Sequence, residues 1–216
     1  MEEVVIRQYQ KEDRPFVREI AWDTAFIGES ADNFFADREI LASFLTEYFT
    51  DYEPGSCFVA CQASGKVIGY LLGAKNPAIL EKVFKIKIFP RLLIQAILKG
   101  TLLKKKNLVF IFHYFISFLR KEFKMPDFSL DYPACLHINL EKNWRNLKIG
   151  SRLISIYLDY LAKSKIAGVH LATFSSKASS FFRAQGFNLL HKGRRSYFRH
   201  ILHKDVPIYI FGQRLQ

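Results

Sequence analysis

The sequence lacks an apolar run long enough to cross a bilayer. Its longest uncharged apolar stretch, Leu108–Leu119, has 12 residues, whereas a membrane-spanning helix needs about 20. The opening residues are acidic and then alternate between apolar and polar, without the basic head and apolar run of a secretory signal peptide. We therefore expect neither an integral membrane protein nor a signal peptide.

Cysteine is scarce, with only three residues: Cys57, Cys61 and Cys135. The number is odd, and Cys57 and Cys61 stand four apart in an apolar run that predicts a strand, where side chains at that spacing lie too far apart to form a disulfide. We expect all three thiols to be reduced and the protein to be cytoplasmic.

Acidic residues are also few, 20 against 32 lysines and arginines, which makes the formal net charge +12. Segment 77–126 carries eleven basic residues against Glu81 and Glu122, so it holds nine of those net charges. No repeat or Pro/Gly-rich linker divides the chain, and half of its residues are apolar. This composition favours a single packed domain over 1–216, with an insertion at about 77–126.

The basic segment has the pattern of amphipathic helices over Ile79–Ile88, Arg91–Leu103 and Leu108–Phe123. Two interpretations stay open. Either the Ile, Leu and Phe face packs on the domain with the lysines in solvent, or the segment lies on an anionic membrane surface or binds an acidic partner. A nucleic acid is not an expected partner, because the basic residues alternate with apolar ones at core-like spacing and no recognised nucleic-acid module is present.

Elsewhere the hydrophobic period predicts alternating strands and helices. The first half reads as a strand, two helices and a hairpin: Val4–Tyr9, a helix led by Pro15, Asp37–Phe49, Cys57–Gln62 and Val67–Gly73. The second half reads as strand, helix, strand, helix and two last strands: Ala134–Leu140, Lys148–Lys163, Gly168–Phe174, Lys177–Gln185, Phe187–His191 and Ser196–Ile201. Strand, helix, strand in this order predicts a parallel pair with a right-handed crossover.

A polar turn joins the strand ending at Leu140 to the helix that follows. A helix start offers unpaired backbone N–H groups and the positive end of a dipole, which suits an anion. Arg145, Lys148 and Arg152 add positive charge there. The turn is therefore a candidate phosphate site.

The same residues carry a resemblance to a known family. Trp144-Arg145-x-x-x-Ile149-Gly150-Ser151 before a helix, and Ala178-x-x-Phe181-Phe182-x-x-x-Gly186-Phe187 after the next strand, resemble the core of the GNAT acyl-CoA N-acetyltransferases. The likeness covers the chain apart from the insertion. It implies an α/β (α+β) GNAT fold: a mixed sheet of about seven strands, splayed between the fourth and fifth, with a helical insertion between the third and fourth.

Three shorter sequence segments indicate a subgroup of that family. Tyr132–Leu140, Gly168–Leu171 and Asp51–Ala60 look like bacterial acetyltransferases related to the acetyltransferase-like domain attached to O-GlcNAcases.

The resemblance implies acetyl-CoA as the cofactor, in the cleft between the splayed strands, and no metal. Its arm would bond to backbone near the end of the fourth strand, its pyrophosphate would meet the turn, and the following strand and helix would line the thioester. The implied cofactor residues are Ile138, Asn139, Leu140, Arg145, Asn146, Leu147, Lys148, Ile149, Gly150, Ser151, Phe174, Ser175, Ala178, Phe181 and Phe182.

The sequence departs from the family pattern at four positions. Lys148 replaces a glycine of the phosphate loop, Ser175 an asparagine, and Phe182 the tyrosine that often serves as general acid, while Ala134 stands where a catalytic carboxylate is often found. Replacement catalysts are Asp131, His137 and Tyr197, with Tyr132 and His170 as further candidates. Asp23, Asp51 and Glu53 are predicted to attract a cationic acceptor.

Two functions remain open from the sequence. The first is transfer of an acetyl group from acetyl-CoA to a primary amine of a small molecule or peptide. The second is a catalytically silent acetyl-CoA-binding or protein-interaction module, which the missing acid and base favour. Neither the acceptor nor the oligomeric state follows from the sequence.

Overall fold

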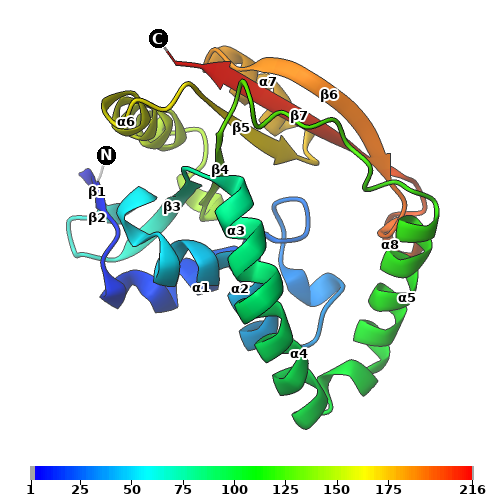
Figure 1. Ribbon diagram of the computed structural model, residues 1–216. Helices are drawn as coiled ribbons and strands as arrows, with labels where there is room; N and C mark the ends of the chain where they lie inside the picture. The colour runs from blue at the N-terminus through cyan, green and yellow to red at the C-terminus, as the bar shows by residue number, and fades with distance from the viewer. Residues whose placement is uncertain (1–2, 216) are drawn as a thin grey trace.

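The computed structural model describes residues 3–215 and contains one mixed seven-stranded sheet (Figure 1). The strands stand in the order β1-β2-β3-β4-β5-β7-β6, and β4 and β5 are the parallel pair. The strands are β1 (Val4–Gln8), β2 (Cys57–Gln62), β3 (Val67–Ala74), β4 (Ala134–Leu140), β5 (Gly168–Thr173), β6 (Asn188–Arg195) and β7 (Val206–Arg214).

The helices cover the two faces of this sheet (Figure 1). On one face α6 and α7 pack over the strands. On the other α1 packs over β3 and β4, α2 packs on α1 and α4 on α2, while α5 stands apart beside α8. The α-helices are α1 (Arg14–Thr24), α2 (Arg38–Glu47), α3 (Pro77–Val83), α4 (Phe89–Leu98), α5 (Lys105–Leu119), α6 (Ile149–Lys163), α7 (Ser176–Ala184) and α8 (Arg199–Leu202). Short 3-10 turns are η1 (Lys11–Asp13), η2 (Ala31–Asn33), η4 (Pro54–Ser56), η6 (Thr101–Leu103) and η7 (Lys142–Trp144), and π-helical turns are η3 (Tyr48–Tyr52) and η5 (Phe84–Ile88).

Local sequence signals explain several helix starts. Pro15 stands in the first turn of α1, where no intrahelical donor is needed. Asp37 caps α2 by accepting from the Ile40 N–H, and Ser175 caps α7 by accepting from the Ala178 N–H. Helix α6 has no side-chain cap, and its N-cap Lys148 is left-handed.

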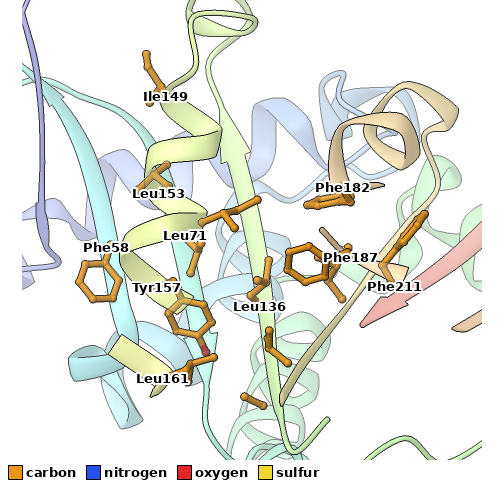
Figure 2. Close-up of a cluster of buried hydrophobic side chains, with 14 of the residues drawn as sticks. Phe58, Leu71, Leu136, Ile149, Leu153, Tyr157, Leu161, Phe182, Phe187 and Phe211 are labelled. Atoms are coloured by element: carbon orange, nitrogen blue, oxygen red, sulfur yellow. The ribbon is translucent and has the colours of Figure 1, made fainter. Parts of the chain in front are cut away.

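The largest core lies between the sheet and α6 and α7 (Figure 2). Leu153, Tyr157 and Leu161 of α6 face Leu71 of β3 and Leu136 of β4. Across β4, the rings of Phe182, Phe187 and Phe211 continue the same core. Both sides of the β4–β5 junction therefore rest on one apolar layer.

The predicted fold class is confirmed, and most element bounds agree within two residues. One assignment was wrong: Ser196–Ile201 is not the last strand. Tyr197 and Phe198 turn into an aromatic cluster with Phe110, and α8 begins at Arg199. The last strand is Val206–Arg214, which pairs with both β5 and β6.

Segment 77–126 runs from the α2 side of the molecule to the β6–β7 side (Figure 1). Helix α4 packs on α2 through Leu92 and Ala96, while Ser117 of α5 bonds to Ser196 beyond β6. Between residues 3 and 215, no helix is long and apolar enough to cross a membrane. The interpretation with the whole apolar face on the domain is not what the structure shows, because many apolar side chains of α4 and α5 are exposed.

Candidate functional site

Strands β4 and β5 pair only at their first residues. Their parallel ladder comprises Ala134 with Val169 and Cys135 with His170. Past that point β4 continues against β3 as far as Leu140, and β5 continues against β7. The two strands therefore separate toward their carboxyl ends, as the resemblance predicted.

The gap exposes one edge of β4. Its register with β3 is continuous from Cys135 to Leu140, and the Glu141 N–H donates to Ile68 O on the β3 side. Because backbone groups alternate between the two edges of a strand, Ile138 and Leu140 present their N–H and C=O groups to the gap. An extended chain with amide groups fits this edge, as the predicted contact with the cofactor arm requires.

The turn after β4 carries a row of unpaired donors. Among residues 3–215, no acceptor is found for the N–H groups of residues 146–151. Asn146 and Lys148 both have positive φ angles, 65° and 61°. Backbone that alternates with left-handed residues turns successive N–H groups toward one point, forming a concave anion site at the start of α6.

The basic side chains of the turn are arranged differently from the prediction. Arg145 donates from Nε to Leu140 O over 3.2 Å and from a terminal nitrogen to Gly28 O over 2.9 Å. Arg152 donates to Val4 O on β1, and Lys142 pairs with Glu29. Arg145 thus holds the α1–α2 loop against the end of β4, and Lys148 is the exposed cation that stands at the helix start itself.

The other half of the predicted cofactor site lies on β5 and α7. Phe181 reaches across to α6, where a Cβ on Gly150 would stand 3.2 Å from its ring. Phe174, just after β5, meets Tyr197 edge to face. Ser175 and Ala178 form the capped first turn of α7. Phe182 is buried in the core beside Phe187 and Phe211, so its role is in packing.

His137 and Asn139 lie on the opposite face of β4, toward α1. The Asn139 amide donates to Tyr70 Oη over 2.8 Å and stands 3.1 Å from His137 Nε2. Burial lowers the pKa of His137 to about 4. The imidazole is therefore neutral at pH 7 and only weakly basic, a poor match to a general base working at that pH. Asn139 contacts this histidine and not the gap.

The other two predicted catalysts lie apart from His137. Asp131 is exposed, pairs with Arg214 over 2.6 Å, and sits against Gly168 at the closed end of the β4–β5 junction. Tyr197 is buried among rings that include Phe174, and this burial raises the pKa of its phenol. Of the two, only Tyr197 stands near the predicted cofactor site.

The three acids predicted for the acceptor do not form one cluster. Asp51 pairs with Arg14 over 2.9 Å. Glu53 accepts from Tyr48 Oη, Ser56 Oγ and the Lys75 N–H, which ties the start of β2 to the end of β3. Asp23 is exposed on α1, and partial burial raises the pKa of its carboxyl.

A cavity of about 360 Å³ opens where β4 and β5 begin to separate. Its lining includes Leu136, His170 and Ala172, together with Asp127 and Ser129 from the loop before β4. His170 Nδ1 lies 2.8 Å from Tyr132 O, which fixes this nitrogen as the protonated one and leaves Nε2 as the acceptor. The sequence named His170 only as a further catalytic candidate. Its pairing with Cys135, the last pair of the β4–β5 ladder, places it at this cavity.

Comparison with known proteins gives structural neighbours only. No family model matches the chain, and no curated protein matches it by sequence. A protein named SsHAT shares 19% identity at a TM-score of 0.71, with 99% of both chains covered. A Drosophila melanogaster polyamine N-acetyltransferase that forms N-acetylagmatine shares 14% identity at 0.60, covering 99% of this chain and 100% of its own.

A third neighbour has its cofactor bound. The GNAT superfamily phosphinothricin acetyltransferase from Sinorhizobium meliloti, in complex with AcCoA, shares 15% identity at a TM-score of 0.58, with 98% of this chain and 88% of that one covered. The chain therefore has the fold of the GNAT acetyltransferases. Identities this low show the fold alone.

Proposed function

We propose that the protein is an acetyl-CoA-dependent N-acetyltransferase acting on a primary amine of a small molecule or peptide. The observation that carries this proposal is the row of unpaired N–H groups at residues 146–151, directly after the β4 edge that β5 leaves open. The row fits a pyrophosphate, and the Ile138 C=O and the Leu140 N–H fit the amides of a pantetheine arm. The neighbours named as acetyltransferases support this proposal.

The proposal assigns a chemical role to three groups near the gap. Acetyl-CoA supplies a thioester whose carbonyl carbon the amine attacks. With acetyl-CoA bound, the Ile138 N–H would donate to the carbonyl oxygen as negative charge develops on it. His170 Nε2 takes the proton that the amine loses, and Tyr132 O keeps the imidazole in the required tautomer. When the C–S bond breaks, CoA would leave as a thiolate, and Tyr197, whose phenol stays protonated at neutral pH and whose ring meets Phe174, would supply its proton.

The acceptor enters from the face of the sheet opposite α6 and α7. The cavity that contains His170 opens there, and Asp127 supplies a carboxylate for a cationic amine. Of the acids predicted from the sequence, Asp23 has no ion pair among the described residues, so it stays a candidate for the same task. Asp51 and Glu53 are occupied by contacts within the protein.

A silent acetyl-CoA-binding module is the second candidate. Phe182 is buried at the position where the family often has a tyrosine that serves as general acid, and His137 is only weakly basic. The usual acid is therefore missing, and one candidate base is too weak. Isothermal titration with acetyl-CoA and with CoA tests the shared part of both candidates. Absence of binding at millimolar cofactor would reject both.

Turnover separates the two candidates. Release of CoA should be followed with polyamines, agmatine and peptide N-termini as acceptors. Acetylation of any of them by wild-type protein, lost in His170→Ala, supports the enzyme. Tight acetyl-CoA binding without release on any acceptor supports the silent module.

Two finer proposals accompany the enzyme. The words at Tyr132–Leu140 and Asp51–Ala60 support kinship with the acetyltransferase-like domain of O-GlcNAcases. Cytoplasmic location is supported by Cys57, Cys61 and Cys135, which are free thiols.

A further inference from the structure

Helix α4 presents an apolar face to solvent. Its inward residues Leu92 and Ala96 are buried against the domain. Between Phe89 and Leu98, Arg91 is the only charged residue, and it is held by Glu47 of α2. The exposed large apolar side chains are Phe89, Leu93, Ile94, Ile97 and Leu98.

Helix α5 also presents an apolar face to solvent, and polar residues lie on its buried side. Asn107 and Ser117 are fully buried. Asn107 accepts from the Ala36 N–H and donates to Thr101 O, and Ser117 bonds to Ser196. These bonds fix the helix with its apolar face outward, and that face comprises Leu108, Ile111, Phe112, Phe115, Phe118 and Leu119.

The two helices meet at a loop, residues 98–106, that points away from α6 and α7 (Figure 1). We call it the tip loop. Its apolar residues Leu98 and Leu103 are 81% and 78% exposed. Lys99 lies between these two leucines in the sequence, and Lys104, Lys105 and Lys106 follow Leu103. Gly100 makes the turn with a φ of 63°.

Exposed apolar area of this extent marks an interaction surface. A second copy of the chain is disfavoured as the occupant, because the facing segments would each carry eleven basic and two acidic residues. An acidic soluble partner would satisfy the lysines but not the apolar face between them. A bilayer with anionic headgroups satisfies both at once.

We propose that α4, the tip loop and α5 dock the protein on an anionic membrane surface. The exposed apolar residues enter the boundary between headgroups and acyl chains, and Lys99 and Lys105 contact the headgroups. The other two tip-loop lysines are held within the protein, where Lys104 donates to Ala36 O and Lys106 pairs with Asp32. The proposal is independent of the acetyltransferase activity, because it uses none of the residues at the gap.

Vesicle co-sedimentation of the full chain tests the proposal. We expect at least tenfold stronger binding to vesicles of phosphatidylcholine with 30% phosphatidylserine than to phosphatidylcholine alone, weakening as salt is raised. A Leu98→Trp variant should show a blue-shifted emission with anionic vesicles and quenching by brominated acyl chains. Equal or absent binding to both vesicles would overturn the proposal.

Matched variants locate the surface. Leu98→Glu/Leu103→Glu should lower anionic-vesicle binding at least tenfold, and Lys99→Glu/Lys105→Glu should remove the preference for anionic lipid. Leu130→Glu, at an exposed leucine outside these helices, should bind as wild type. Circular dichroism and melting temperature confirm that each variant folds.

Two results would reject this apolar face as the membrane-binding surface. If sedimentation velocity shows a dimer that Leu98→Glu/Leu103→Glu dissociates, a second copy covers the face and the proposal fails. If that double variant is folded yet binds vesicles as wild type, the membrane contact lies elsewhere and the proposal also fails.

Discussion

Lys148 offers the sharpest test of the phosphate turn, because it combines a strained backbone with an exposed charge. Its φ of 61° and ψ of 5° are left-handed, which costs a residue other than glycine about 1–2 kcal/mol. Lys148→Gly removes that strain and the charge, and Lys148→Ala removes the charge alone. Lys148→Arg keeps both.

The stability difference between Lys148→Gly and Lys148→Ala follows from two opposing effects. Relief of strain favours glycine by about 1–2 kcal/mol, and the larger backbone entropy of glycine in the unfolded state offsets about 0.5–1 kcal/mol of that. At the middle of both ranges glycine should therefore be more stable than alanine by about 0.75 kcal/mol, or roughly 1.5–3 °C in melting temperature for a chain of this size. Thermal melts of the two variants measure it directly.

Acetyl-CoA affinity distinguishes the effect of the Lys148 charge from the effect of its backbone conformation. A hydrogen bond to a charged group contributes about 1.5–3 kcal/mol, and the lower value applies because Lys148 is exposed. Glycine and alanine variants should both bind acetyl-CoA about tenfold more weakly by titration, while arginine binds nearly as wild type. The reasoning is refuted if glycine melts no higher than alanine, or if both charge-free variants bind as tightly as wild type.

Three other predictions follow from burial and geometry. The pKa of His137 is lowered by burial to about 4, so its neutral form contributes stability that is complete above about pH 6.5 and is lost as pH falls toward 4, by up to about 3 kcal/mol. Denaturant unfolding at pH 7 and pH 4.5 should show that loss in wild type and a smaller one in His137→Gln. His170→Ala should lower the turnover number by about 10²–10⁴ while acetyl-CoA affinity changes little, and an equal loss of affinity would assign this residue to cofactor binding instead. Gly73→Ala places a Cβ 2.3 Å from the Tyr157 ring and should destabilise the fold by about 1–3 kcal/mol, measured by denaturant unfolding. Gly65→Ala, which meets no neighbour within 4 Å, provides a contrast that reports backbone strain alone.

Much of the site could be predicted because it lies in one continuous stretch. Strand Ala134–Leu140, the turn and helix α6 follow one another, so hydrophobic period and turn composition were enough to find them. Lys148 stands where the family has a glycine, and the structure shows that this position has a positive φ. In this stretch the structure is set by residues that are neighbours in the sequence, so the sequence pattern is enough to predict it.

The last strand shows where pattern reading failed. Ser196–Ile201 alternates as a strand would, but Tyr197 and Phe198 find aromatic partners on α5 and on the α1–α2 loop. Those partners lie about 90 to 165 residues away in the chain, so the pattern within the segment held no sign of them. Tertiary packing overrode local propensity.

The candidate catalytic residues were harder to predict for the same reason. Whether a histidine of β4 or of β5 meets the gap depends on the register of three strands and on which helix covers each face. His137 is directed toward α1 beside Tyr70, whereas His170 lines the cavity. Both histidines look alike in the sequence, since each stands within an apolar strand.

By itself, the sequence determined the order of elements as far as β6, the candidate phosphate turn and the concentration of positive charge in 77–126, because periodicity, turn chemistry and charge are local properties. Only the tertiary structure decided that β4 and β5 part after Cys135, that Arg145 holds the α1–α2 loop, and that α5 buries its asparagine and serine with Phe112, Phe115 and Phe118 outside. Each of these depends on which distant residues supply a hydrogen-bond partner, and that is settled only when the chain is packed.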